Sequence, residues 1–490
     1  MISVHAFDST FSKRCLMSLL ESPLTEAAKL SGRTPAVSVG KRTITYRELK
    51  ILVAKAKAFL ENSGVHQESR VAILADNSVE YVVALLALFH SGTVACPVNP
   101  RFTDQTISDY LGRIECTHLI ADAKSAARQR AVPTIDPGRL ISGTKTAELG
   151  NLDLNMDAAV IATSGSTSDP KTVLLTLGNL YYNALGSNQN IPLEEGDNWL
   201  LSLPLYHVGG IGIVLRSLLA LTAMAIPEYQ TSLSESVLAD RPSHLSLVHT
   251  QLYRLMKDDS ALSYLRMMKG ILLGGSAFPS SLISSAFDTG LKIHTSYGLS
   301  EMASQVTTTG RSASRAELGT SGRILPHREL SISSEGEILV KGLTRFKGYL
   351  GIDGLDKPFD ASGWYATGDL GRLDDDNNLL VIGRRDNQFI SGGENIHPEE
   401  IEAAFYRLPG VEEVIVIPVD DPEFGQRPAA FVKQTGSVEL NESELRTSLT
   451  DFLPGFKLPV VCYPWPSELA ASRLKPSRRY LIDRARLLRA

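Results

Sequence analysis

Hydrophobic and polar positions alternate along the first part of the chain in a pattern that predicts helices and strands in turn. The capping box Thr45-Tyr-Arg-Glu48 precedes apolar positions at helical spacing and predicts a helix that ends near Gly64. The short apolar run 70–75 predicts a buried strand, and the apolar run 79–89 predicts the next helix. Strands that alternate with helices favour a parallel sheet.

The alternation continues from residue 158 to about residue 298, and its texture changes after residue 304. Beyond residue 304, short alternating runs and turns, such as 336–342 and 378–383, are typical of a compact β region. We therefore predict an α/β fold with a β-rich part at about 305–384. Before that part, apolar runs predict strands with helical segments between them at 159–163, 199–204, 246–249, 270–273 and 292–296.

The C-terminal segment has the pattern of a separate, small α/β unit. Pro398 suits the first turn of a helix, 414–418 and 429–433 have the pattern of strands, and 442–452 that of a second helix. The stretch before this unit, Gly383-Arg-Arg-Asp386, is charged and rich in neighbouring glycines, which favours a hinge.

Composition narrows the classes of function. The chain has 490 residues, of which 43% are hydrophobic, and 49 basic against 54 acidic residues give a net charge of −5. This balance offers no attraction to polyanions, so we expect no nucleic-acid partner. The four cysteines are scattered, which argues against a disulfide framework or a cysteine metal site and fits a reducing compartment.

The N-terminus and the apolar runs predict a cytoplasmic protein with no membrane insertion. Asp8 precedes the first basic pair, and the apolar run that follows is short and interrupted, unlike a signal peptide. The most apolar stretches, 81–89 and 218–227, are shorter than the ~20 residues that a bilayer span needs.

The sharpest local signal is Thr163-Ser-Gly-Ser-Thr-Ser-Asp-Pro-Lys171, which directly follows a predicted buried strand. Hydroxyls and free backbone N–H groups in such a loop bind phosphate oxygens, and Lys171 adds a positive charge. The stretch is not a Walker A loop, because Pro170 stands where that motif needs glycine. An ordinary surface turn rich in serine and threonine is the alternative.

This loop resembles the phosphate-binding signature of the adenylate-forming superfamily, which includes acyl-CoA synthetases and luciferases. Further segments that resemble superfamily motifs follow in the same order along nearly the whole chain. They are Leu203-Pro-Leu-Tyr-His-Val-Gly209, Gly274-Gly-Ser276, Tyr297-Gly-Leu-Ser-Glu301, Thr367-Gly-Asp369, Gly383-Arg384 with Asp386, and Gly392-Gly-Glu-Asn-Ile396. Each motif is moderately specific, and six in order are very specific.

The resemblance implies a fold, a reaction and a set of co-substrates. The fold is a large N-terminal domain over 1–384, with layered, mostly parallel sheets and a small β-barrel-like part, and a small mobile C-terminal α+β domain over 385–490. In the reaction, a carboxylate attacks the α-phosphorus of ATP to give an acyl-adenylate, and the thiol of coenzyme A then displaces AMP. Positioning and cations supply most of the catalysis in such chemistry, and Mg²⁺ is the expected metal.

The resemblance also implies roles for individual residues. Glu301 is the expected Mg²⁺ ligand, Asp369 the acceptor for the ribose hydroxyls, and Asp386 the hinge. Taken alone, each has a structural alternative: a helix N-terminus for Glu301, packing for Tyr297, a turn for Asp369 and an exposed linker position for Arg384. The full set for the nucleotide is Thr163, Ser164, Gly165, Ser166, Thr167, Lys171, Gly274, Gly275, Ser276, Tyr297, Gly298, Ser300, Asp369 and Arg384, and the set for the coenzyme A channel is Gly392 and Gly393.

Lys475 is the expected cation of the adenylation step, although its segment departs from the family pattern. The segment reads Ser472-Arg-Leu-Lys-Pro-Ser-Arg-Arg479, so Leu474 replaces the expected glycine and Arg473 is a rival for the role. A solvated basic tail is the structural alternative. Two more departures, Ser168 and Thr172, fall in and beside the phosphate loop.

The acid substrate is indicated by two segments that resemble the o-succinylbenzoate:CoA ligase family of menaquinone biosynthesis, namely 205–216 and 297–305. That family activates one carboxylate of an aromatic dicarboxylate and must recognise the other. Arg216 lies in an otherwise apolar helix pattern, where an unpaired cation is costly, and a bound carboxylate removes that cost. His207 is expected beside the reacting carboxylate, and Ser304 and Gln305 beside the rest of the acid. Arg216 at the surface or paired with a structural acid, and His207 in the core, are the alternatives.

The sequence therefore predicts an AMP-forming acid–thiol ligase whose partners are an aromatic dicarboxylate, ATP and coenzyme A. The catalytic set is Lys475, His207 and Glu301. Another aryl- or acyl-CoA ligase, an adenylation enzyme that loads a carrier protein, and a catalytically silent nucleotide-binding protein stay open. The oligomeric state also stays open, a homo-oligomer included.

Overall fold

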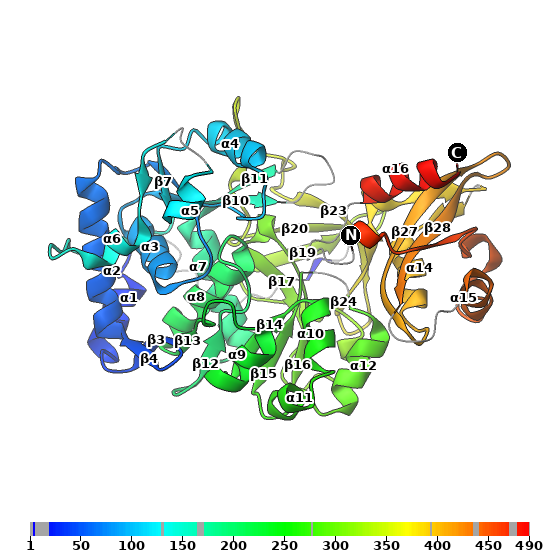
Figure 1. The fold of residues 1–490 in the computed structure, drawn as a ribbon, viewed down its shortest axis with the longest axis horizontal. Coiled ribbons are helices and arrows are strands. Elements are labelled where there is room, and N and C mark those ends of the chain that lie inside the picture. The colour runs from blue at the N-terminus through cyan, green and yellow to red at the C-terminus, as the bar shows by residue number, and fades with distance from the viewer. Residues whose placement is uncertain are drawn as a thin grey trace.

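The structure is a computed structural model, and it describes residues 3–4, 19–128, 132–163, 171–275, 278–392, 394–434, 441–469 and 478–489. Two large sheets and a smaller five-stranded sheet form the body that precedes residue 385 (Figure 1). A further sheet is built from strands that follow residue 388. The predicted strands before residue 300 are divided between the two large sheets: 70–75 and 159–163 fall in the eight-stranded sheet, and the other four fall in the nine-stranded sheet.

The eight-stranded sheet has parallel strands at its centre and antiparallel strands at one side. β5, β6, β7 and β8 pair in parallel, β10 joins β6 in parallel, and β11, β21 and β22 add antiparallel strands. Its order is β22 (Gly354–Asp356), β21 (Gly348–Gly351), β11 (Lys171–Thr176), β10 (Asp157–Thr163), β6 (Val94–Pro97), β5 (Arg70–Leu74), β7 (His118–Ala121) and β8 (Thr134–Ile135).

The nine-stranded sheet repeats this plan with a parallel centre and antiparallel ends. Its order is β18 (Arg323–Ile324), β17 (Ser304–Thr308), β16 (Ile293–Leu299), β15 (Gly270–Leu273), β14 (His244–Leu247), β12 (Asn198–Leu200), β13 (Ala223–Ala225), β3 (Pro35–Val39) and β4 (Arg42–Thr45). The short strands β2 (Leu19–Leu20) and β9 (Leu152–Asp153) form a separate pair.

Helices pack on both large sheets, and the largest hydrophobic cluster contains residues of both sheets. Buried residues of α2, α3, α7 and α8 belong to a single cluster with strands of both sheets. The helices of this part are α1 (Pro23–Leu30), α2 (Tyr46–Asn62), α3 (Val79–His90), α4 (Asp104–Arg113), α5 (Ala123–Ala126), α6 (Pro137–Ser142), α7 (Leu177–Asn190), α8 (Val208–Ala220), α9 (Leu233–Asp240), α10 (His249–Leu255), α11 (Asp259–Leu265), α12 (Ser280–Asp288) and α13 (Arg315–Leu318), with the 3₁₀ turn η1 (Ser300–Met302).

The β-rich part divides its strands among three sheets instead of forming one unit. β17 and β18 extend the nine-stranded sheet, and β21 and β22 extend the eight-stranded sheet. The remaining four strands form a sheet with the N-terminal strand β1 (Ser3–Val4). All pairs are antiparallel, and the order is β1, β19 (Arg328–Ile332), β20 (Glu337–Gly342), β23 (Tyr365–Leu373) and β24 (Leu379–Arg384).

The C-terminal residues form a sheet with its own hydrophobic clusters, drawn in orange and red in Figure 1. The 3₁₀ turn η2 (Arg385–Asn387) leads from β24 into this sheet. Its strands are β26 (Glu394–Ile396), β25 (Phe389–Ser391), β28 (Gly425–Gln434) and β27 (Val411–Asp421), with β29 (Cys462–Pro464) beside β28. Its helices are α14 (Pro398–Phe405), α15 (Glu442–Leu449) and α16 (Arg478–Arg489), with the 3₁₀ turns η3 (Gly455–Lys457) and η4 (Ser467–Leu469).

Most predicted elements are confirmed, with differences in the bounds of several. The strand predicted at 246–249 lies at His244–Leu247 as β14, and the helix predicted at 442–452 ends at Leu449 as α15. The capping box at Thr45 and Glu48 is formed at the start of α2. The strand predicted at 199–204 ends at Leu200 as β12, because the following backbone groups bond to a side chain from another part of the chain. In the part of the chain that the structure describes, no helix has the length and apolar character needed to cross a membrane.

Candidate active site

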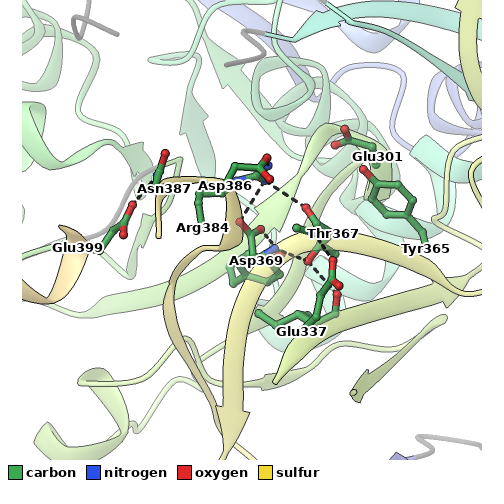
Figure 2. A network of polar contacts seen from close by, with 12 residues as sticks. Glu301, Glu337, Tyr365, Thr367, Asp369, Arg384, Asp386, Asn387 and Glu399 are labelled. Carbon is green, nitrogen blue, oxygen red and sulfur yellow. Dashed lines mark hydrogen bonds and ion pairs between the residues drawn. The ribbon is translucent and has the colours of Figure 1, made fainter. Parts of the chain in front are cut away.

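Three residues predicted to bind the nucleotide meet at one point. Asp369 on β23 is the register partner of Arg384 at the end of β24. The Tyr297 hydroxyl donates to Asp369 Oδ2 at 2.6 Å, and Arg384 Nη1 donates to Asp369 Oδ1 at 3.2 Å. Figure 2 shows Asp369 and Arg384 facing each other, with Thr367 and Glu337 beside them. Each Asp369 oxygen thus has one protein donor and keeps a second lone pair for another hydroxyl.

The surroundings of Asp369 act on its pKa in opposite directions. Burial raises the pKa of Asp369 above its usual value, while the hydrogen bond from Tyr297 and the charge of Arg384 act in the opposite direction. Burial, followed by the charge of Asp369, raises the pKa of Tyr297 well above its usual value. Tyr297 is therefore a neutral donor at physiological pH, and Asp369 an acceptor.

Glu301 lies on η1 beside two tyrosines that the sequence did not indicate. The Tyr349 hydroxyl donates to Glu301 Oε1 at 2.7 Å and lies 2.7 Å from the Tyr365 hydroxyl. Figure 2 shows Glu301 and Tyr365 close together. The Lys171 ammonium lies 4.9 Å from the centre of the Tyr349 ring, so the predicted phosphate-binding lysine and Glu301 contact the same tyrosine.

The surroundings of Glu301 fit a Mg²⁺ ion that is shared with a polyphosphate. One carboxylate oxygen accepts from Tyr349, and the carboxylate retains acceptor positions for a metal. No group of three or more acidic, histidine or cysteine side chains that could enclose a metal occurs among the described residues. Mg²⁺ commonly binds one or two carboxylates together with waters and substrate phosphates, so a single carboxylate is a suitable donor.

Arg216 on α8 is a buried cation with uncharged partners. Its side chain is 2% exposed, and Nη1 donates to Gln305 Oε1 at 3.0 Å and to the Ser187 hydroxyl at 3.3 Å. Its guanidinium carbon lies 4.3 Å from the centre of the Trp199 ring. No acceptor for its Nε occurs among the described residues. Burial lowers the pKa of Arg216 to about 9, which still leaves the side chain charged at neutral pH.

Gln305 connects Arg216 to a second buried arginine. Gln305 on β17 is 3% exposed, and its Nε2 donates to the Thr308 hydroxyl at 2.8 Å. Its backbone carbonyl accepts from Arg328, whose other donors reach the carbonyls of Pro326 at 3.0 Å and Asn183 at 3.4 Å. Gln305 is therefore fixed by its backbone and its side chain, and sequence patterns gave no indication of Arg328.

His207 lies immediately before α8, at the other end of that helix from Arg216. Its ring lies 4.7 Å from the Tyr206 ring, centre to centre. Burial among the neighbouring atoms, and then the charge of Arg101, lower the pKa of His207 below its usual value. A neutral imidazole at physiological pH follows.

Glycines and one serine of the predicted site adopt tight backbone arrangements. Gly275 has φ of +79°, which favours glycine. A Cβ on Gly298 would collide with the Ser304 carbonyl, because β16 and β17 bulge at this point. Ser304 has φ of +125°, and the carbonyl of Ser300 accepts from the N–H of Ala303 at 3.0 Å.

The predicted hinge residue Asp386 and the predicted coenzyme A channel residue Gly392 follow the Asp369 cluster in the sequence. Arg384 Nη2 bonds to Asp386 Oδ2 at 3.3 Å, and Asn387 Nδ2 donates to Glu399 Oε1 at 2.6 Å (Figure 2). Gly392 has φ of +58° and its N–H donates to the Phe424 carbonyl at 3.0 Å, within the C-terminal sheet. Gly392 therefore belongs to the C-terminal sheet, whereas Asp386 bonds directly to Arg384 of the Asp369 cluster.

Several predicted residues lie outside the described residues: Ser164, Gly165, Ser166, Thr167, Ser276, Gly393 and Lys475, together with Arg473, Leu474 and Ser168. The flanks of the phosphate loop are described. Thr163 and Lys171 are register partners on β10 and β11, and the Thr163 hydroxyl lies 3.4 Å from the Lys171 carbonyl. The hydroxyl of Thr172, a residue that departs from the family pattern, donates to the Leu350 carbonyl.

Comparisons with known proteins match nearly the whole chain. The family model described as AMP-binding enzyme matches residues 24–350, and the model described as AMP-binding enzyme C-terminal domain matches residues 400–473. A 2-succinylbenzoate–CoA ligase from Bacillus cereus is 30% identical over 484 residues, which cover 96% of this chain and 100% of that protein.

Two solved structures of a related enzyme are similar to this chain in three dimensions. The o-succinylbenzoate CoA synthetase (MenE) from Bacillus subtilis in complex with the acyl-adenylate intermediate OSB-AMP has a TM-score of 0.84 and 28% identity, and the match covers 96% of this chain and 98% of that one. The same enzyme in complex with ATP and magnesium ion has a TM-score of 0.81 and 28% identity, with 91% and 96% covered. The present chain belongs to the AMP-binding enzyme family.

Proposed function

We propose that the chain is a 2-succinylbenzoate–CoA ligase. One carboxylate of the acid attacks the α-phosphorus of ATP, the bond to pyrophosphate breaks, and an acyl-adenylate forms. The sulfur of coenzyme A then attacks the acyl carbon, the bond to AMP breaks, and the thiol proton is lost. The relatives with this activity, and the complexes of the relatives with OSB-AMP, ATP and magnesium, support the proposal.

The observation that carries the substrate assignment is the buried guanidinium of Arg216. Its partners among the described residues are a hydroxyl and an amide, which leave a full positive charge in an apolar surrounding. A charge in such a place is costly without a counter-charge. The second carboxylate of the acid supplies that counter-charge, while its first carboxylate lies toward His207, which is about two and a half helical turns away along α8 at 3.6 residues per turn.

The nucleotide roles follow from the cluster at Asp369. Asp369 accepts the ribose hydroxyls with the lone pairs that Tyr297 and Arg384 leave free. Tyr297 presents its ring to adenine, beside Gly274, Gly275 and Ser276. Lys171 and the preceding residues 163–167 bind phosphate oxygens, and Glu301 holds Mg²⁺, which neutralises charge on the phosphates.

The C-terminal residues supply the moving part. Residues 385–490 rotate about Asp386, so that Lys475 reaches the α-phosphate in the first half-reaction and the Gly392-Gly393 face meets the thiol in the second. The separate hydrophobic clusters of this part support its motion as a unit. The scattered cysteines suit the reducing cytoplasm, where we place the reaction.

The test of the proposal is ATP- and CoA-dependent thioester formation with a panel of acids. The panel contains o-succinylbenzoate, benzoate, a monocarboxylate aryl ketone and a medium-chain fatty acid, and both pyrophosphate release and thioester are measured. We expect the dicarboxylate to have the highest kcat/KM. Equal or better use of a monocarboxylate would refute the substrate assignment, and no pyrophosphate release with any acid would indicate a silent nucleotide-binding protein. Transfer to a carrier protein but not to free CoA would indicate a carrier-loading enzyme.

The half-reactions can be separated at Lys475. Lys475→Ala is expected to cripple adenylation and to leave thioester formation from a supplied acyl-adenylate largely intact. Arg473→Ala is the matched control, because it removes a neighbouring cation from the same segment. Equal loss of both half-reactions in Lys475→Ala would refute the two-state role of the C-terminal part, and a larger loss in Arg473→Ala would move the role to Arg473.

A further inference from the structure

The segment that leads to His207 makes three hydrogen bonds to a single asparagine that follows a strand of the other large sheet. Asn77 lies between the end of β5 in the eight-stranded sheet and the start of α3. Its Nδ2 donates to the carbonyls of Leu201 at 3.2 Å and Leu203 at 2.9 Å, and its Oδ1 accepts from the N–H of Leu205 at 2.9 Å. One side chain thus satisfies three backbone groups of a segment that follows β12 in the nine-stranded sheet.

The pattern of these bonds explains why the residue is an asparagine. The three bonded residues are spaced two apart, so the amide of Asn77 pairs with an extended segment as a short stretch of strand would. A side-chain amide carries two N–H donors and a carbonyl acceptor, which matches two carbonyls and one N–H. Without it, three backbone groups in a half-buried place would need other partners.

The position of this segment sets the position of His207. After the last bonded residue come Tyr206 and His207, and the His207 N–H donates to the Pro204 carbonyl at 3.1 Å. The first turn of α8 packs directly on the segment, since a Cβ on Gly210 would collide with the Pro204 carbonyl. The segment is also bonded to the nine-stranded sheet, because the Ser202 hydroxyl donates to the Ser246 carbonyl on β14 at 2.6 Å. Because these contacts are direct, a displacement of the segment at Asn77 would also displace His207.

We infer that Asn77 is a positioning residue that fixes His207 against the reacting carboxylate and thereby couples the two large sheets at the active site. This inference rests on the proposed function, because it takes the role of His207 from there. A misplacement of a reacting group by about 1 Å commonly costs about 100-fold in rate, so a small change at Asn77 has a measurable effect.

The test is a double-substitution cycle of Asn77→Asp with His207→Ala. Asn77→Asp keeps the size and the acceptor but replaces two donors with a charge that faces two carbonyl oxygens. We expect it to lower kcat of adenylation about 10- to 100-fold, with the KM for ATP unchanged because the Asp369 cluster lies on other strands. In the His207→Ala background the same substitution is expected to have little further effect, since residues that act through one another are not additive.

Asn198→Asp is the matched control. Asn198 is also half-buried and also bridges the backbone, accepting from the Ser243 N–H at 2.7 Å and donating to the Asp240 carbonyl at 3.3 Å, at the start of β12. Its effect should be on thermal stability and should be the same with and without His207. If Asn77→Asp does not fold, Asn77→Ser takes its place in the cycle.

The outcomes separate this inference from the proposed function. A wild-type protein that releases no pyrophosphate with any acid refutes the proposed function. An active wild-type protein in which the Asn77 and His207 effects simply add refutes the inference and leaves the function standing. A rise in the KM for ATP equal to the fall in kcat would also refute it, because it would indicate general disruption.

Discussion

Two buried arginines in different parts of the molecule have pKa values that shift in opposite directions. Arg478 on α16 donates to Glu399 at 2.9 Å, to Glu402 at 2.5 Å and to the Val416 carbonyl at 2.8 Å. Burial acts to lower the pKa of Arg478, but the two carboxylates outweigh it and raise that pKa. Arg216 donates to a hydroxyl and an amide instead, and burial lowers its pKa to about 9.

The difference separates a structural cation from a cation that is suited to a ligand. The charge of Arg478 is neutralised within the chain, so it joins α16 to α14 and β27. Arg328 is an instructive third case, because burial also lowers its pKa to about 9, but each of its nitrogens donates to a backbone carbonyl. The absence of a carboxylate partner is therefore not enough to identify an arginine that binds a ligand. What distinguishes Arg216 is a missing carboxylate together with an Nε that has no acceptor among the described residues.

The largest expected effect is on stability, from Arg478→Met. Removing one member of a partly buried ion-pair cluster leaves Glu399 and Glu402 without a counter-charge, which commonly costs about 3–5 kcal/mol. We expect a matching loss in the free energy of unfolding of the C-terminal part, measured by denaturant titration. Arg484→Met is the control, because its partner Glu468 is 44% exposed and the pair should contribute little. A loss no greater than that of the control would show that Arg478 is not a structural cation.

Arg216→Met should have the opposite profile, with a large effect on substrate use and no loss of stability. Loss of a buried charge contact to a ligand commonly costs about 2–5 kcal/mol, so the KM for o-succinylbenzoate should rise at least about 30-fold. The pKa of Arg216 is depressed, so the folded state holds that proton less tightly than the unfolded chain does. The charge therefore costs stability below about pH 9, and its removal should maintain or raise Tm. Kinetics on the monocarboxylate ketone are the control and should stay near the wild-type values. A fall in Tm with an unchanged KM would make Arg216 structural.

Gln305→Glu converts the Arg216 site into one like that of Arg478. The new carboxylate would lie at the position of the present acceptor, 3.0 Å from Arg216 Nη1, and would compete with the carboxylate of the acid. We expect the KM for o-succinylbenzoate to rise roughly 5- to 30-fold, equivalent to about 1–2 kcal/mol, and Tm to rise. Gln251→Glu is the control for an added charge, because Gln251 caps α10 away from Arg216. Unchanged dicarboxylate kinetics in Gln305→Glu would show that Arg216 does not bind the acid.

The elements whose ends were predicted well are those with a signal within a few residues of the end. The capping box at Thr45 starts α2, and Pro398 starts α14, because caps and first-turn prolines act within one turn of helix. The strand predicted at 199–204 extended too far because Asn77, far away in sequence, replaces a neighbouring strand beyond Leu200. In the β-rich part, the sequence pattern indicated strands but not the sheets to which they belong, since tertiary packing decides which strands pair.

The candidate site was predictable where a motif supplied the residue and not where packing did. Tyr297, Asp369 and Arg384 came from separate motifs and contact one another. The neighbours that shape their surroundings came from no motif, because a buried tyrosine such as Tyr349, or a tryptophan such as Trp199, has the sequence signature of any core residue. Their roles depend on distances that only the fold creates. The assigned roles of the motif residues remain predictions.

The smallest expected effect is on the pH profile, through Arg101. Burial, followed by the charge of Arg101, lowers the pKa of His207, so the imidazole stays neutral until the pH falls below its usual pKa. If neutral His207 is the active form, kcat/KM for adenylation falls on the acid side as His207 gains a proton. Arg101→Gln removes a repelling charge, raises the pKa of His207 and moves this acid limb to higher pH by less than about one unit. His207→Gln should abolish the limb, and Arg113→Gln, which changes a charge on α4, should leave it in place. An alkaline limb in place of the acid limb, moving to higher pH in Arg101→Gln, would mean that His207 acts in its protonated form, and its charge would then join that of Arg216 in holding the dicarboxylate.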